Sequence, residues 1–267
     1  MSSGITIKTE KEIEIIKEGG RILAKIMKDL EKKVEPGVTT KELNKVAEDL
    51  IFRFGAKPSF KGYEGFPAAL CTSINEELVH CIPSDRKLKK GDIISLDLGI
   101  LYKGFHTDMA ITVPVGKISA EAQRLIRITK KALKRGIKKV RPGITFGDIG
   151  NTIQRYIESQ GYGVVRDLCG HGIGREIHEE PQIPNYGKRR EGPEIKEGMT
   201  FCIEPMVTVG DWRLTKSKDN YGFQTKDNSL CAHFEHTLAV TQNGCEVLTA
   251  LLGNANLKVV RLRPRAK

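Results

Sequence analysis

The chain has 267 residues, with 44 Lys and Arg against 33 Asp and Glu, which gives a formal net charge of +11. This length suits one large domain or two small ones, and no apolar run of about 18 residues is present to cross a membrane. The six cysteines lack C-x-x-C spacing, which excludes a disulfide framework and a structural zinc site, and the polar N-terminus excludes a secretory signal. We therefore expect a cytoplasmic protein with reduced thiols, no membrane partner and a preference for anionic partners.

Two amphipathic helices are predicted at the start of the chain. A capping box at Thr9 precedes apolar residues at three- and four-residue spacing, and this helix should end before Pro36. A second capping box at Thr39 should begin another helix, which Gly55 ends.

The same order of elements returns later in the chain. A third helix should stop before Pro142, and Thr145 should cap a fourth helix that ends at Gly161. The segment VEPGVT from Val34 matches VRPGIT from Val140 at an offset of 106 residues. So long a period indicates an internal duplication, with halves of approximately residues 8–116 and 117–250.

The segment GDIISLDLGILYKGFHTDMAITV, residues 91–113, reads as two strands joined by a turn at residues 101–104. Simple antiparallel pairing would place Asp97 and Asp108 directly opposite each other, with side chains roughly 5 Å apart. Two like charges in an apolar sheet need a shared proton or a cation. From these two residues alone, a solvated pair on an exposed strand is an equally good interpretation.

A second pair of carboxylates follows the same pattern. Glu204 ends an apolar strand six residues after a glycine, as Asp97 does, and Glu235 precedes an apolar stretch, as Asp108 does. If the halves pack about a pseudo-twofold axis, all four carboxylates converge, and they cannot remain ionised together without cations.

Some of the six histidines could complete such a site. His171 lies between glycines that allow close approach of a ligand, whereas His178 and His80 are further possibilities. Three other histidines are expected outside the metal ligand set. His236 directly follows Glu235 in its strand and should point to the opposite face, whereas His106 and His233 each lie two residues, or roughly 7 Å, before a carboxylate. Four carboxylates with one imidazole can hold two divalent ions and acidify a water, which predicts a hydrolytic site.

These motifs together resemble those of the type I methionine aminopeptidases of the short bacterial type, over about residues 13–248. The resemblance is carried by an ordered set: SINE at residues 73–76 with His80, Asp97 and Asp108, CGHGIG at 169–174, HEEP at 178–181, IEP at 203–205 and EHT at 235–237. The short interval between His178 and Glu204 leaves no room for the insertion of type II enzymes. The resemblance implies a monomer with an α+β pita-bread fold, in which residues 1–267 form a single catalytic domain of two pseudo-twofold-related halves, with antiparallel sheet and flanking helices.

The resemblance also implies the site residues and the reaction. The metal ligands would be Asp97, Asp108, His171, Glu204 and Glu235, with Asp108 and Glu235 bridging two divalent ions, which could be Mn, Fe, Co or Zn. The enzyme would remove the N-terminal methionine of nascent proteins whose second residue is small. A metal-bound hydroxide would attack the scissile carbonyl, His178 would stabilise the oxyanion, Glu204 would relay the proton, and His80 would lie near the scissile nitrogen.

The substrate pocket follows by the same resemblance. Its residues would be Phe60, Tyr63, Phe66, Cys71, His80, Ile177, His178 and Tyr221. Phe60, Ile177 and Tyr221 replace the commoner cysteine, phenylalanine and tryptophan, so the shape of the pocket is expected to differ in detail.

Two other functions fit parts of the pattern. Xaa-Pro aminopeptidases and dipeptidases share the fold and the metal ligands, but usually carry an additional N-terminal domain. A non-catalytic pita-bread protein that binds RNA or ribosomes would suit the positive charge, but such proteins typically lose metal ligands, and none is missing here. For the enzyme itself, the charge predicts transient association with ribosomes, with the densest basic run in the tail at residues 258–267.

Overall fold

The computed structural model describes residues 4–251, which contain both α-helices and mainly antiparallel strands, so the predicted α+β class is confirmed. The basic tail at residues 258–267 lies outside this range. The helices are α1 (Glu10–Glu31), α2 (Thr40–Arg53), α3 (Ala120–Lys139) and α4 (Phe146–Ser159), with a short 3-10 helix η1 (Tyr63–Gly65). The strands are β1 (Lys57–Pro58), β2 (Leu70–Ile74), β3 (Glu77–Val79), β4 (Ile93–Tyr102), β5 (Phe105–Pro114), β6 (Gly163–Val164), β7 (Gly170–Gly172), β8 (Glu179–Ile183), β9 (Thr200–Ile203), β10 (Met206–Thr208), β11 (Leu214–Lys216), β12 (Phe223–Thr225), β13 (Cys231–His233), β14 (His236–Thr241) and β15 (Gly244–Val247).

The four predicted helices are confirmed, and their starts follow from their caps. In α1 the Thr9 side chain accepts from the backbone N–H of Glu12, whose carboxylate accepts in turn from the Thr9 N–H. Thr39 begins α2 with the same reciprocal arrangement, and at the start of α4 the Asp148 carboxylate accepts from the Thr145 N–H at 3.1 Å. Within the described chain, no helix is long and apolar enough to cross a membrane.

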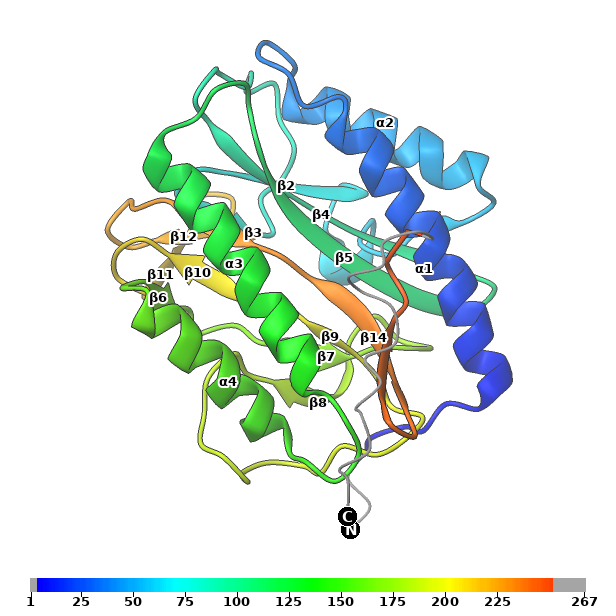
Figure 1. Ribbon diagram of the computed structural model, residues 1–267. Coiled ribbons are helices and arrows are strands. Elements are labelled where there is room, and N and C mark those ends of the chain that lie inside the picture. The colour runs from blue at the N-terminus through cyan, green and yellow to red at the C-terminus, as the bar shows by residue number, and fades with distance from the viewer. Residues whose placement is uncertain (1–3, 252–267) are drawn as a thin grey trace.

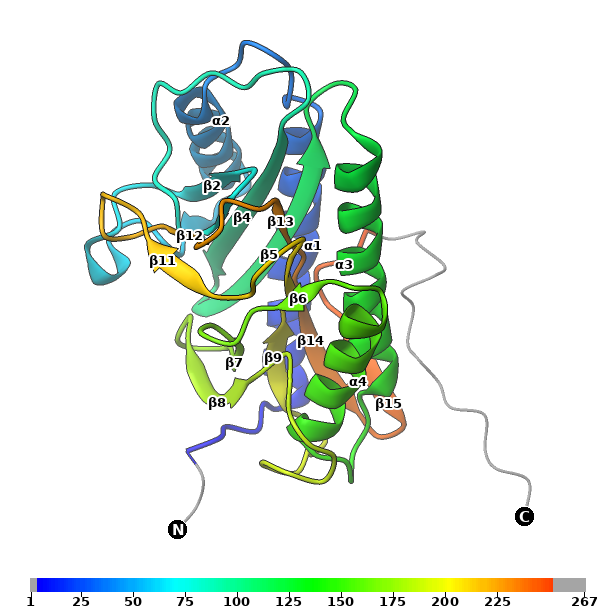
Figure 2. The ribbon, with the colours of Figure 1, turned by 90° about the vertical axis from the view of Figure 1, so that its left-hand side faces the viewer.

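Each pair of helices packs against its own set of strands (Figure 1). α1 and α2 cover β4, β5 and β2, while α3 and α4 pack on each other and on β10, β13 and β15. Two large apolar clusters result, one built around α1, α2 and the β4 sheet, the other around α3, α4 and strands β9, β13 and β14. Figure 2 shows α3 and α4 on one side of the strands and the β11–β12 hairpin on the other.

Antiparallel ladders define four sheets. In the first, β4 pairs with β1, β2 and β5; the largest has the order β15-β14-β9-β7-β8; and the two smaller sheets are β13-β10-β6 and β11-β12-β3. Contacts between β5 and β14 join the two parts of the molecule. There the Thr237 hydroxyl donates to the carbonyl of Asp108 at 2.8 Å, and the backbone N–H of Glu235 donates to the carbonyl of Ala110 at 2.9 Å.

The register of the central hairpin corrects one expectation. Asp97 pairs with Ala110 and Asp108 pairs with Gly99, so the two aspartates are not directly opposite each other. The reason is the turn, which is the two-residue loop Lys103-Gly104 with both φ angles positive, one residue beyond the assumed centre. Because Asp97 is two positions from Gly99, both carboxylates still project from the same face of the sheet.

Candidate metal centre and active site

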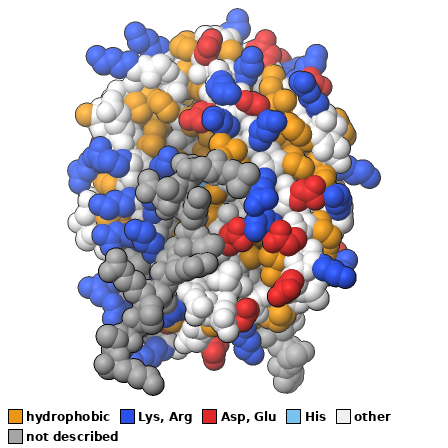
Figure 3. All heavy atoms as spheres, turned by 45° about the vertical axis from the view of Figure 1, so that its right-hand side comes forward, with side chains coloured by type: hydrophobic (Ala, Val, Ile, Leu, Met, Phe, Trp, Pro, Cys, Tyr) orange, Lys and Arg blue, Asp and Glu red, His pale blue; other side chains and the backbone are white. Residues whose placement is uncertain are grey.

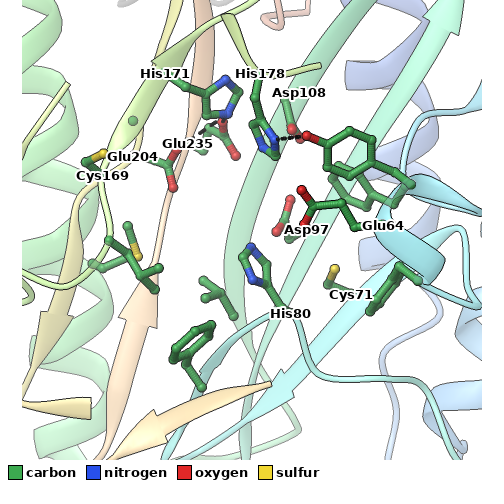
Figure 4. A pocket seen from close by; sticks show the side chains of 18 of the residues that line it. Glu64, Cys71, His80, Asp97, Asp108, Cys169, His171, His178, Glu204 and Glu235 are labelled. Carbon is green, nitrogen blue, oxygen red and sulfur yellow. Dashed lines mark hydrogen bonds and ion pairs between the residues drawn. The ribbon is translucent and has the colours of Figure 1, made fainter. Parts of the chain in front are cut away.

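A cavity of about 760 Å³ opens where the two sets of strands meet. It is lined by all five residues expected to bind metal, by His80 and His178, and by five of the other expected pocket residues, namely Phe60, Tyr63, Phe66, Cys71 and Tyr221. Figure 4 shows the four carboxylates gathered in this cavity, with the imidazoles of His80, His171 and His178 around them. Residues that are 138 positions apart in the chain, Asp97 and Glu235, thus reach one site.

The four carboxylates come from two pairs of strands. Asp97 and Asp108 lie on β4 and β5, whereas Glu204 directly follows β9 and Glu235 directly precedes β14. Ile203 and His236 form the last pair of the β9–β14 ladder, which brings the two glutamates next to it together. Ligand oxygens of Asp97, Asp108 and Glu235 all lie within 4.8 Å of one another.

Burial of these carboxylates makes their ionisation unfavourable without a cation. Burial, then the charge of Glu204, raises the pKa of Asp108 to about 7, and burial raises the pKa of Glu204 to about 8. For Asp97 and Glu235, burial and then the charge of Asp108 raise the pKa well above its ordinary value. Asp97 Oδ1 and Glu235 Oε1 are buried without a hydrogen-bond partner among residues 4–251. Unpaired buried oxygens of this kind fit ligands of a divalent metal ion.

His171 is oriented to add a nitrogen ligand. Its Nδ1 lies 2.9 Å from the carbonyl oxygen of Gly172, so Nδ1–H donates there and leaves the Nε2 lone pair free. That Nε2 lies 3.6 Å from Glu204 Oε1 and 3.9 Å from Glu235 Oε1. Burial, then the neighbouring His178, lowers the pKa of His171 to about 3, which keeps the ring neutral, as a metal ligand must be.

Two further imidazoles face the cavity beside the carboxylates. The His178 ring stands at 90° to that of His171 with centroids 4.5 Å apart, and its Nδ1 lies 3.0 Å from the Tyr63 hydroxyl. Burial lowers the pKa of His178, so this ring too is neutral at pH 7. His80 has a positive φ of 59° and is held against Phe223, and burial lowers its pKa to about 4.

The expected methionine pocket is formed in part by an apolar cluster. Phe66 and Cys71 are buried beside Phe60 and Tyr221, and the rings of Phe66 and Tyr221 meet edge to face at 5.7 Å. Ile177 does not reach the cavity surface. It is 2 % exposed and packs with Ile173 and Cys202 behind Phe60, so it supports the wall of the pocket instead of lining it.

The three histidines expected outside the ligand set occupy different places. His106 Nδ1 lies 2.8 Å from the Ser59 hydroxyl, and His236 Nδ1 lies 2.9 Å from that of Thr249. His233 is buried with its Nε2 3.4 Å from Glu204 Oε2, a proximity that sequence reasoning missed because it considered only the distance to Glu235 along the strand. Neither nitrogen of His233 has a hydrogen-bond partner within residues 4–251.

Cys202 was also missed. The sequence predicted reduced thiols without a role in the site; five of the six cysteines are buried and Cys169 is half-buried at the cavity. The thiol of Cys202, however, lies within 4.8 Å of ligand atoms of both His171 and Glu235. Its position two residues before Glu204 on β9 is the signal that could have placed it there, since alternate strand residues share a face.

Comparison with known proteins identifies the family of the chain. Residues 14–242 match the model of metallopeptidase family M24. The chain belongs to this family. It is 49 % identical to the methionine aminopeptidase of Clostridium acetobutylicum over 246 residues, which cover 92 % of this chain and 98 % of that protein. The crystal structure of methionine aminopeptidase from Rickettsia prowazekii superposes with a TM-score of 0.91 at 42 % identity, covering 92 % of this chain and all of that one.

The fold is also shared with a prolidase. The prolidase of Pyrococcus horikoshii superposes with a TM-score of 0.73 at 27 % identity. The matched region includes 92 % of this chain but only 63 % of the prolidase. These neighbours confirm the expected pita-bread fold. Membership of a metallopeptidase family implies binding of divalent metal, and the buried, unpaired carboxylate oxygens with the free His171 nitrogen suit it.

Proposed function

We propose that the protein is a methionyl aminopeptidase that holds two divalent metal ions and removes the N-terminal methionine of nascent proteins when the second residue is small. The observation that carries this proposal is the group of four buried carboxylates beside an apolar pocket, in a chain similar along nearly its whole length to methionine aminopeptidases. The metal ligands would be Asp97, Asp108, His171, Glu204 and Glu235. Glu235 would take part in holding both ions, since it has candidate ligand atoms within 4.8 Å of those of Asp97 and Asp108 and of those of His171.

The metal ions, when bound, would act as Lewis acids on the scissile carbonyl and acidify a water molecule. The surrounding residues have separate tasks. His178 would donate from Nε2 to the oxygen of the carbonyl as negative charge develops there, because the Tyr63 hydroxyl on Nδ1 favours the tautomer that carries its proton on Nε2. Glu204, which lies beside His171 among the four carboxylates, would carry the proton from the water to the leaving nitrogen. His80 would hydrogen-bond near that nitrogen as a neutral imidazole.

The methionine side chain would occupy the apolar part of the cavity. Phe60, Phe66, Cys71 and Tyr221 offer ring edges and a thiol, which favour contact with a flexible thioether. Tyr221 is fixed there by a hydrogen bond of 3.0 Å from its hydroxyl to the carbonyl of Gly65. A single domain with residues 8–116 and 117–250 as duplicated halves is part of the same proposal. The two apolar clusters support the halves, and the hydrogen bonds between β5 and the residues at β14 support their union in one domain.

Metal analysis combined with a Met-Ala-Ser peptide assay tests the proposal. The purified protein should retain divalent metal and release methionine, and exhaustive chelation should stop turnover. Asp97→Ala and Glu235→Ala should abolish both metal retention and turnover. Glu246→Ala, which removes a surface carboxylate paired with Lys17 at 3.0 Å, serves as the matched control and should keep both. Full activity in a ligand variant or after chelation would sink the proposal.

The second candidate activity is cleavage before proline. It is favoured only by the shared fold of the prolidase, and this chain covers less than two thirds of that protein. Peptides of the Met-Pro and Ala-Pro type, assayed beside Met-Ala-Ser, distinguish the two enzymes. Faster hydrolysis of Ala-Pro than of Met-Ala-Ser would favour the Xaa-Pro activity.

We also propose that the protein acts in the cytoplasm as a monomer and docks transiently on ribosomes through basic surface. α3 carries eight Lys and Arg residues and one Glu, and none of these basic residues is in an ion pair within the described part of the chain. Lys131 and Arg135 stand over the ring of Tyr156, at 5.5 Å and 4.5 Å. Figure 3 shows basic side chains spread widely over one face of the molecule, with several at its left-hand edge.

Co-sedimentation with ribosomes at increasing salt tests this docking. Binding should weaken steeply with salt, because counterions are released from RNA when basic residues bind it. The triple variant Lys131→Glu, Arg135→Glu and Lys138→Glu should bind less than a control with Lys28→Glu on α1 and Lys32→Glu at the C-cap of that helix. Absence of binding at low salt, or binding that salt does not affect, counts against the proposal.

A further inference from the structure

We infer that Lys8 is a positioning residue for His178, which it holds in place through Glu179 and the loop of residues 174–178. This inference rests on the proposed function, since the orientation of His178 affects turnover only if this imidazole contacts the substrate. Neither Lys8 nor Glu179 was among the site residues expected from the sequence.

Lys8 is buried although it lies ahead of the first helix. Its backbone N–H donates to the carbonyl of Gly198 at 2.8 Å, which fixes the N-terminal segment against the turn before β9. Its ammonium forms an ion pair with Glu179, in which the two side chains are only 5 % and 10 % exposed. A pair so well removed from water needs both partners, because either charge left alone would be buried without compensation.

The Glu179 carboxylate connects the N-terminal segment to the loop. Its Oε2 accepts from Lys8 and, at 2.6 Å, from the hydroxyl of Thr6. Its Oε1 accepts from the backbone N–H of Arg175 at 2.7 Å and from that of Glu176 at 3.3 Å. The Glu179 carboxylate therefore holds the start of the 174–178 loop close to its end, where His178 lies. Burial would raise the pKa of Glu179, but hydrogen bonds from Lys8 and Thr6 outweigh it and lower this pKa, so the carboxylate stays ionised.

The loop is also held at its other end. The backbone N–H of His106 on β5 donates to the carbonyl of Gly174 at 2.7 Å. Arg175 donates to Glu12 at 2.8 Å, so α1 contributes as well. A Cβ at Gly174 would collide with Lys8 and Glu179, which shows how tightly the N-terminal segment and the loop are packed. These contacts leave His178 at the point where the loop enters β8.

Loss of the Lys8 charge should therefore act on His178 and not on the metal ligands. Those ligands are carried by β4, β5, β7 and the ends of β9 and β14. Glu179 pairs with Gly172 of β7 through the backbone, but its carboxylate bonds the N-terminal segment and the N–H groups of residues 175 and 176. With Glu179 unpaired, its carboxylate should turn toward water and release the N–H groups of Arg175 and Glu176. The imidazole would then lose its fixed position, and a misplacement of about 1 Å can cost roughly 100-fold in rate.

Three substitutions test the inference on the metal-loaded full chain with Met-Ala-Ser. Lys8→Met should lower kcat by about tenfold while KM changes by less than about twofold and metal content stays the same. Lys8→Arg, which keeps the charge, should restore most of kcat. Lys17→Met is the matched control: it removes another ion pair of the N-terminal region, with Glu246 at 3.0 Å, away from the 174–178 loop, and should leave kcat unchanged. Glu179→Gln provides a second variant if Lys8→Met does not fold.

Hydrogen exchange and a double variant separate positioning from general destabilisation. The backbone amides of Arg175 and Glu176 should exchange faster in Lys8→Met than in the unmodified protein, whereas amides in α3 should not. In a His178→Ala background, Lys8→Met should cause no further loss of kcat. Unmodified kcat in both Lys8→Met and Glu179→Gln overturns the inference, as does loss of metal in step with activity. An unmodified protein that does not cleave Met-Ala-Ser would instead refute the proposed function, and the exchange measurement would still test the contacts.

Discussion

The hydroxyl of Tyr63 and Nδ1 of His178 lie 3.0 Å apart, and the two rings meet edge to face with centroids separated by 5.2 Å. Tyr63 is part of η1 and His178 ends the 174–178 loop, so this contact joins segments that are 115 residues apart in the chain. One residue expected only to shape the methionine pocket thus also orients the imidazole proposed to stabilise the oxyanion.

Tyr63→Phe should lower kcat by roughly 3- to 10-fold, because a neutral hydrogen bond contributes about 1 kcal/mol and the tautomer of His178 is no longer fixed. KM for Met-Ala-Ser should change little, since the ring that faces the pocket remains. Steady-state kinetics at pH 7.5 measures both quantities. A rise in KM with unchanged kcat would show instead that the hydroxyl contacts the substrate directly.

His178→Ala should lower kcat by roughly 10² or more while metal content stays the same, as expected for a donor aimed at developing charge. The imidazole stands beside His171, but its Nδ1 accepts from the Tyr63 hydroxyl, so Nε2 carries the ring proton and offers no lone pair to a metal ion. Metal analysis of the variant by mass spectrometry provides the check. Metal loss in His178→Ala would place this histidine in the ligand set.

The sequence predicted those features of the fold that depend on residues close together in the chain. Thr9, Thr39 and Thr145 fixed the starts of three helices because capping uses residues three positions apart. The expectation that Asp97 and Asp108 face each other was wrong, because the turn lies one residue further along the chain and such a shift changes every cross-strand pair.

Contacts between distant segments could not be predicted in this way. Lys8 and Glu179 are 171 residues apart, and no periodicity or motif connects them. The proximity of His233 to Glu204 likewise depends on how β13 and the end of β9 pack in three dimensions. The repeated pattern did predict that the four carboxylates meet in one cavity, because Asp97 and Asp108 lie on one pair of strands as Glu204 and Glu235 lie beside another.

The metal-free protein should become less stable between pH 7 and pH 8. Asp108 and Glu204, with pKa values raised to about 7 and about 8 by burial, keep protons in the folded state that the unfolded chain releases near pH 4. The folded state therefore binds more protons, and each retained proton lowers the stability by about 1.4 kcal/mol per pH unit. The buried histidines do not change this loss of stability between pH 7 and pH 8. Their lowered pKa values keep them neutral in the folded protein, and histidine is already mostly neutral in the unfolded chain at these pH values.

Calorimetry of the chelated protein and of the metal-loaded protein over this range measures the effect. Tm of the chelated protein should fall from pH 7 to pH 8, and the difference between the two forms should widen, because metal ions compete better for carboxylates as protons become scarce. A Tm of the chelated protein that rises over the same range contradicts the raised pKa values.

Ile177→Phe should change the choice between methionine and leucine through Phe60. Ile177 is buried with Ile173 and Cys202, and Phe60 lies between this cluster and the cavity. A larger ring at position 177 overpacks the cluster, which costs about 1–3 kcal/mol unless Phe60 moves toward the cavity. That movement narrows the pocket, so the ratio of kcat/KM for Leu-Ala-Ser to that for Met-Ala-Ser should fall, by up to the 10- to 200-fold that about 1–3 kcal/mol of discrimination allows. Ile177→Val, which only removes a methyl group, is the matched control and should leave the ratio near that of the unmodified protein. An unchanged ratio in Ile177→Phe, with a folded protein, would show that Ile177 and Phe60 do not shape the methionine pocket.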